Sequence, residues 1–274
     1  TGQFCNPFFV SLYGSSNFWE NNCPRWKQES ANLSSYIFCN HIVGMGHFKF
    51  IAWQIKTADT ESRTVKALKL YQDLLKFHAN DEDKSAYIDA SLGRLNFGKN
   101  KAYGESKNDR YRSAIKGFIN KWADHRISAR ARFHLAQSLD QEGDKVQAHK
   151  IAKQGKETYP DSPGGAMCHN LINQIEAKSS NITIERVWNN PRPDITVKYR
   201  NVDEIHFRVV AENWEAAMKR KRGNPQWLDN NERKALMQKE IVKQWSVKLP
   251  PTKDFHESVK TIKAPEGLPQ GFYY

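Results

Sequence analysis

The segment at residues 111–122, YRSAIKGFINKW, contains the clearest structural signal in the chain. Its apolar residues recur at i, i+3, i+4, i+7, i+8 and i+11, which is the spacing of one face of an α-helix. These residues are Tyr111, Ala114, Ile115, Phe118, Ile119 and Trp122. Similar stripes lie on both sides of this segment, at residues 64–78, 83–95, 128–141, 144–158 and 163–177. The pattern predicts a series of helices from residue 61 to residue 178.

The helix pair that ends before Pro160 fits the tetratricopeptide pattern of about 34 residues, in which two antiparallel helices form one repeat. With Pro160 as the closing proline, the repeat begins at Ala129 and Gly143 lies in its turn. Ala136 and Ala148 then occupy positions where helix axes must approach to ~8–10 Å, which requires small residues. The preceding repeat is irregular, because a glycine- and lysine-rich loop is expected at residues 98–108. A generic antiparallel helix bundle is the alternative.

After Lys178 the apolar period changes from helical spacing to strict alternation, which is typical of half-buried strands. The alternating segments are residues 181–185, 195–199, 205–209 and 245–249. We therefore expect an α+β chain with two segregated domains, a helical repeat at 61–178 and an antiparallel β-sandwich at 179–274. A helical or loop insertion is expected at 213–244.

The two ends of the sequence lead to further expectations. Residues 1–60 form an aromatic-rich segment with a helix expected near residues 32–50. Residues 271–274, GFYY, have the composition of a strand that is beginning, so we expect the sandwich to be cut short and the chain to be part of a longer protein.

The four cysteines, Cys5, Cys23, Cys39 and Cys168, form no C-x-x-C pair and lack the spacing of a zinc site. Cys5 and Cys23 would close a short loop in an oxidising compartment, and four ordinary thiols are the alternative. Cys168 lies on an apolar helix stripe, so we expect a packed thiol there. No metal or cofactor is expected.

Several strings in the helical and strand regions resemble the N-terminal region of large bacterial alpha-2-macroglobulin-like proteins. They are ALKLYQDLLKFH at 67–78, YID at 87–89, YPDSPGGA at 159–166, NLINQI at 170–175, YRNV at 199–202 and LPQGFY at 268–273. The resemblance covers residues 30–274, and it implies tetratricopeptide-like helices followed by the first macroglobulin-type sandwich.

The resemblance also implies a function and a location. Members of this family are generally secreted across the inner membrane and are often lipid-anchored in the cell envelope. They are thought to trap proteases with a bait segment and a Cys-Gly-Glu-Gln thioester. The resemblance therefore implies a periplasmic or envelope location after removal of a leader, with membrane contact only through a lipid anchor outside this segment. The residues that follow the four cysteines are Asn6, Pro24, Asn40 and His169, so no thioester motif occurs in this chain. The expected function is a non-enzymatic scaffold that binds a protein partner and the remaining domains of the parent.

Motif searches give no support for an enzyme. The phosphate-loop, dinucleotide-binding, zinc-protease and nucleophile-elbow motifs are all absent from the sequence. His78, His125 and His134 are expected to be surface or partly buried residues, and a hydrolase that uses the His and Asp residues is a remaining hypothesis. No run approaches the ~18 consecutive apolar residues of a membrane span, so we expect no transmembrane segment.

The chain has 42 Lys and Arg against 30 Asp and Glu, a formal net charge of +12. The densest basic run is Lys219, Arg220, Lys221 and Arg222, close to Trp214 and Trp227. A module that binds nucleic acid or an anionic surface is the alternative function, because Lys and Arg neutralise phosphates and Trp stacks on bases. The other Lys and Arg residues are scattered along the chain. We therefore interpret the basic run as a solvated loop and do not expect nucleic acid as a partner.

The protein-binding hypothesis selects four residues on helix 128–141. In a tetratricopeptide helix, the positions without a packing role within the repeat face a groove. Here these positions are Arg130, Phe133, Gln137 and Asp140. They are expected to contact a protein partner, unless they are simply solvated or covered by residues 1–60.

Overall fold

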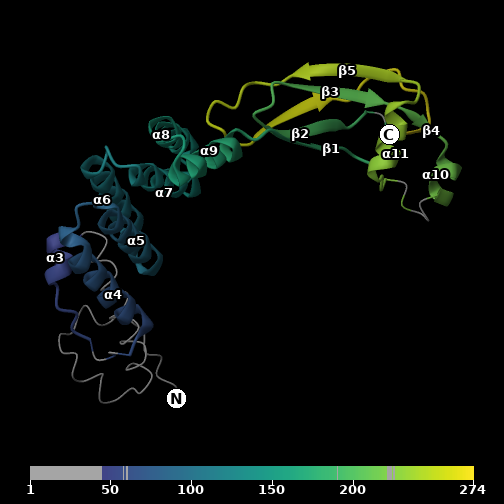
Figure 1. Cartoon of the computed structure of the whole chain (residues 1–274). Helices are drawn as coiled ribbons and strands as arrows, with labels where there is room; N and C mark the ends of the chain where they lie inside the picture. Colours follow the sequence, from purple (N-terminus) through teal and green to yellow (C-terminus); the bar gives the residue numbers. More distant parts are fainter. Residues whose placement is uncertain (1–44, 58, 60, 190, 221–223, 225) are drawn as a thin grey trace, which may run out of the picture. The chain divides into compact units, whose positions relative to one another are not determined.

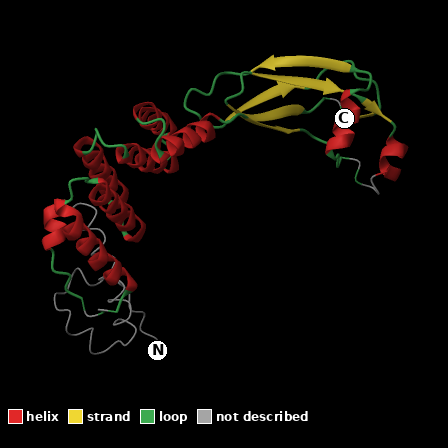
Figure 2. Cartoon of the chain, viewed as in Figure 1, coloured by secondary structure: helices red, strands yellow, loops and turns green. Residues whose placement is uncertain are grey.

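The computed structural model describes residues 45–57, 59, 61–189, 191–220, 224 and 226–274. The chain divides into two compact units, Thr1–Ile172 and Asn173–Tyr274, which we call the helical unit and the sheet unit. Helices dominate the first and small antiparallel sheets the second, as Figures 1 and 2 show, so the expected α+β class is confirmed. The expected helix near 32–50 falls largely outside the described residues, as do Cys5, Cys23 and Cys39.

The described part of the chain contains seven α-helices before the first strand. They are α3 (His47–Ala52), α4 (Arg63–Phe77), α5 (Ser85–Lys101), α6 (Lys107–Lys121), α7 (Ile127–Gln141), α8 (Lys145–Thr158) and α9 (Pro163–Glu176). A short 3-10 helix, η2 (His78–Asn80), follows α4. The helices predicted from the apolar stripes are present with shifts of a few residues at their ends.

The prediction of a loop over residues 98–108 is wrong in its extent, because the loop is shorter in the structure. Helix α5 continues to Lys101 and α6 begins at Lys107, which leaves a short connection. The helix continues because Leu95 and Gly98 are both buried on the same face. Burial of that face outweighs the low intrinsic helix propensity of glycine, which costs only ~1 kcal/mol.

Small residues line the interface between α7 and α8, where the repeat pattern required them. Ala129, Ala136, Ala148 and Ala152 are all fully buried. The turn between the two helices contains Gly143 in the left-handed region, with φ of +90°. Asp144 then caps α8 by accepting a hydrogen bond from the Gln147 backbone N–H.

The described residues of the sheet unit form seven strands in three small antiparallel sheets. The strands are β1 (Ser179–Thr183), β2 (Asp194–Arg200), β3 (Glu204–Val209), β4 (Ala211–Glu212), β5 (Lys243–Lys248), β6 (Ser258–Lys263) and β7 (Phe272–Tyr273). The sheets are β1-β2-β6, β3-β5 and β4-β7. The insertion contains α10 (Trp214–Arg220) and α11 (Asn230–Met237), the second of which begins with a capping box formed by Asp229 and Glu232.

Side chains from two of the sheets meet in one core. Val197 and Tyr199 of β2 pack in the same cluster as Ile205 and Phe207 of β3, together with Leu249. The Phe207 ring stacks on Trp245 of the neighbouring strand β5, with 4.7 Å between centroids and 6° between planes. No helix in the described part of the chain is long and apolar enough to cross a membrane.

Candidate protein-binding site

Helix α7 lies at the centre of the helical unit, in contact with α5, α6 and α8. Every residue from 127 to 140 is buried or half-buried. The four residues predicted for a partner, Arg130, Phe133, Gln137 and Asp140, are all half-buried. The spacing of Arg130, Phe133 and Gln137 places them on one face of the helix.

Two of the four predicted residues form ion pairs within the unit. Arg130 pairs with Asp89 of α5, and Asp140 pairs with Lys145 of α8 at 2.6 Å. The Asp89 carboxylate remains 53% exposed, so the Arg130–Asp89 pair lies at the surface. Asp140 is only 16% exposed and holds the start of α8 against the end of α7, which is a structural role.

Sequence reasoning missed two residues that belong to the same region, the neutral imidazole of His134 and the cation of Lys99. The His134 ring lies against Phe133, edge to face, with centroids 5.3 Å apart. Burial, together with the positive charges of Arg130 and Lys99, lowers the pKa of His134 to about 4. Lys99 of α5 is therefore close enough to act on the α7 face. Lys99 was not selected from the sequence, because it lies in the segment that was predicted to be a loop.

We define the α7 surface as Arg130, Phe133, His134 and Gln137 of α7 with Asp89 and Lys99 of α5. It combines one phenyl ring, one imidazole, one amide, two permanent cations and one exposed carboxylate. Arg130 and Lys99 both contribute positive potential at His134, and Asp89 contributes a negative charge beside Arg130. These groups can bind a polypeptide by packing, hydrogen bonding and ion pairing.

The low pKa of His134 leads to a pH-dependent stability. An ordinary histidine pKa is about 6.5, so between pH 6.5 and pH 4 the unfolded chain binds a proton that the folded chain does not. Stability of the helical unit should therefore fall as pH falls through this window. We expect His134→Asn to lose less stability than the wild type between pH 7 and pH 4.5 in urea unfolding.

The control for this pH experiment is His206→Asn, because His206 is exposed in the sheet unit. That variant should lose as much stability of the helical unit on acidification as the wild type does. Equal acid sensitivity of His134→Asn and the wild type would show that His134 does not carry the effect.

A hollow of about 530 Å³ lies elsewhere in the helical unit. It is lined by residues of α6 and α7, by Asp144 and by residues of α8, namely Asp109, Arg112, Ser113, Lys116, Leu139, Asp144, Gln147 and Ile151. None of the four predicted residues lines it. Arg112 is held there by ion pairs with Asp109 and Glu142.

The basic run in the sheet unit is partly neutralised. Arg220 lies 3.8 Å from Glu212 and 3.3 Å from Glu232, and Lys239 pairs with Glu212 at 2.7 Å. The hydrogen bond from Lys239 lowers the pKa of Glu212 below its usual range. Lys219 is exposed at the end of α10. The two other residues of the run, Lys221 and Arg222, lie outside the described residues.

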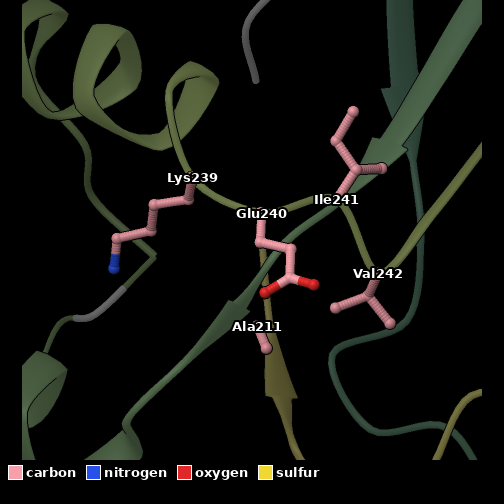
Figure 3. A pocket seen from close by; sticks show the side chains of 5 residues that line it. All are labelled: Ala211, Lys239, Glu240, Ile241 and Val242. Atoms are coloured by element: carbon pink, nitrogen blue, oxygen red, sulfur yellow. The ribbon is translucent and has the colours of Figure 1, made fainter.

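A second hollow, of about 560 Å³, borders this ion-pair group and is lined by Ala211, Lys239, Glu240, Ile241 and Val242. Figure 3 shows the Glu240 carboxylate directed toward Ala211, while the Lys239 side chain extends away from it. The lining contains the Glu240 carboxylate, the Lys239 side chain and three aliphatic residues, and it contains no histidine or cysteine.

His125 lies beside a hydroxyl but is not oriented as the base of a nucleophile and base pair. His125 Nε2 lies 3.1 Å from Ser85 Oγ. The other ring nitrogen, Nδ1, accepts a hydrogen bond from the Ile127 backbone N–H, so Nε2 carries the proton in the neutral ring and donates to Ser85. His125 therefore donates a hydrogen bond to the Ser85 hydroxyl instead of accepting one. In this tautomer it cannot act as the base that activates Ser85.

The thiol expected to be packed at Cys168 is confirmed. Cys168 is free and fully buried, its Sγ donates to the Ala129 carbonyl at 3.5 Å, and burial raises its pKa to about 11. Among the described residues, no group of three or more His, Cys, Asp or Glu side chains could hold a metal ion.

Comparisons of the chain with protein-family models, with curated proteins and with solved structures found no match. The α7 surface is therefore interpreted from its own geometry.

Proposed function

We propose that the helical unit is a tetratricopeptide-type module that binds an extended, acidic protein segment across the α7 surface. The observation that carries this proposal is the row of half-buried residues Arg130, Phe133 and Gln137 along one face of α7, beside the buried face of the same helix. A half-buried aromatic between a cation and an amide is the composition of an interface anchor.

Charge favours an acidic partner over a basic one. Arg130 forms an ion pair with the exposed Asp89 carboxylate. The Lys99 ammonium lies over the Tyr111 ring, 4.7 Å from its centroid, and its charge acts on His134. A carboxylate of the partner can pair with Arg130 and Lys99. A cation of the partner would be repelled by both side chains, because Asp89 is the one carboxylate of this surface that balances them. Two flanking cations would also speed association with an acidic segment.

The wider proposal follows the resemblance to bacterial alpha-2-macroglobulin-like proteins. The order of helices before antiparallel strands and the shared core of two sheets are the features that support it. On this proposal the sheet unit is a macroglobulin-type β-sandwich, and the chain is a scaffold region of an envelope protein whose partners include proteases trapped by the parent.

A pull-down from cell-envelope extract tests the binding role. We expect Phe133→Ala to reduce recovery of bound protein by roughly tenfold and Arg130→Glu to reduce it at least as much, because interface anchors are worth about 1–2 kcal/mol or more. Bound proteins are quantified by mass spectrometry after washing at physiological salt.

Matched controls lie on α8, away from the α7 surface. Val146→Ala removes an exposed apolar side chain, and Lys150→Glu reverses an exposed charge. Both should retain wild-type recovery. If the two α7 variants recover the same proteins as wild type in the same amounts, while their far-UV circular dichroism is unchanged, the binding proposal fails.

A further inference from the structure

Among the residues that the structure describes, strand β3 is paired along one edge, and its other edge is open over most of its length. On one side it pairs with β5 from Glu204↔Lys248 to Val209↔Lys243. Within the described residues this sheet has two strands, and the core-facing residues Ile205, Phe207 and Val209 of β3 are nevertheless buried. Two-stranded sheets are marginal alone, and about three strands are usually needed for stability.

The hydrogen-bond pattern shows which backbone groups lie on the open edge. The carbonyls of Asp203 and Val209 accept from Leu249 and Val242 on the β5 side, at 2.8 and 2.9 Å. Val210 instead exchanges both of its backbone hydrogen bonds with Tyr274, at 3.0 and 2.9 Å, on the opposite side. Because backbone groups alternate along a strand, Glu204, His206 and Arg208 present their N–H and C=O groups on the same side as Val210.

A third strand already begins on that side. Strand β7 pairs with β4 through Glu212↔Phe272 and Ala211↔Tyr273, and the Val210–Tyr274 pair continues the same antiparallel register. The next residue in this register is Val209, which is the last residue of β3. The open edge of β3 is therefore collinear with the paired β4–β7 segment.

We propose that the open edge of β3 is a strand-acceptor site, and that it takes an extended segment in direct continuation of β7. The segment runs antiparallel to β3 and presents apolar residues opposite Val209, Phe207 and Ile205, on the core side. On the outer side it presents an acidic residue opposite Arg208 and a basic residue opposite Glu204. Backbone hydrogen bonds supply affinity, and this alternation supplies specificity.

A second copy of the chain is a poorer occupant. An antiparallel β3–β3 pairing centred on His206 would bring the partner strand past Val210. The backbone groups of Val210 are already bonded to Tyr274, so the incoming strand would have to displace β7.

The test is an extension of the full chain by the segment Val-Glu-Val-Thr-Val-Lys, joined directly after Tyr274. A tethered strand acts at a high effective concentration, so no separate peptide is needed. We expect backbone amide exchange at His206 and Arg208 to slow by at least about tenfold, because the two N–H groups gain acceptors. The unfolding midpoint of the sheet unit should rise by about 5 °C.

Two control extensions separate strand addition from a general effect of added residues. One serine inserted between Tyr274 and the segment shifts its register by one residue and turns its apolar side chains outward. A proline opposite His206 removes the N–H that would bond to the His206 carbonyl. Both should return exchange at His206 and Arg208 to the unextended level.

Three outcomes would overturn the proposal. They are unchanged exchange in the extended chain, equal slowing in the serine-shifted control, and slowing that appears only together with a doubling of the mass in solution.

Discussion

Replacing Gly164 by alanine is expected to destabilise the helical unit by roughly 2–4 kcal/mol. A Cβ atom at this position would overlap the Arg130 backbone nitrogen and lie 2.7 Å from the carbonyl carbon of Ala129 and 2.9 Å from Cα of Arg130. These atoms belong to the backbone of α7 and cannot rotate away. The gain of ~1 kcal/mol in helix propensity does not offset such an overlap.

Two further glycine variants calibrate this prediction. Gly117→Ala on α6 meets nothing within 4 Å, so the same change should stabilise the unit by up to about 1 kcal/mol. At Gly155 the added Cβ would meet Cys168 Sγ at 2.6 Å, a side-chain atom that can shift, so an intermediate loss is expected. The measurement is urea unfolding followed by circular dichroism. Wild-type stability of Gly164→Ala would contradict the close approach of α9 to α7.

The glycine contacts explain why one string of the sequence is distinctive. Residues 159–166, YPDSPGGA, join α8 to α9. Ser162 Oγ donates to the Tyr159 carbonyl and accepts from the Gly165 backbone N–H, at 2.8 and 2.9 Å. Gly164 lets α9 approach α7, and a Cβ at Gly165 would overlap the Tyr159 carbonyl. Periodicity alone predicted the two helices but could not assign these roles, because they depend on a backbone distant in sequence.

The helices were predictable because their stripes are local. Tyr111, Ile115 and Phe118 are buried as the spacing of the first quoted segment requires, while Ile119 is half-buried at the margin of the stripe. Strand β6 was missed for an equally local reason. Val259 is 61% exposed and Ile262 faces inward, so its two apolar residues are three apart and do not alternate.

The α7 surface was only partly predictable. The helical period selects Arg130, Phe133 and Gln137 as residues that face away from the repeat core. It cannot show that Asp89 pairs with Arg130, or that Lys99 raises the potential at His134, because both residues belong to another helix. Contacts between helices depend on packing angles and offsets, which apolar periodicity does not specify.

Replacing Phe207 by alanine should cost the sheet unit about 3–5 kcal/mol, the range for deleting a buried phenylalanine. Phe207 is buried among Val197, Tyr199 and Ile205, and its ring stacks on Trp245. Loss of the stacked pair adds about 0.5–1.5 kcal/mol to the cost. A unit with one small core has little stability to spare, so we expect it to be largely unfolded at room temperature.

The helical unit should survive this change, because its core contains none of the residues packed around Phe207. Hydrogen exchange resolved by residue is the measurement that separates the two units. Amides of β2 and β3 should lose protection in Phe207→Ala, whereas amides of α6 and α7 should keep it. Val259→Ala, an exposed site in the same unit, should leave both sets unchanged. Equal loss of protection in α7 and β2 would instead mean that the two units unfold as one, and the core around Phe207 would then support the whole chain.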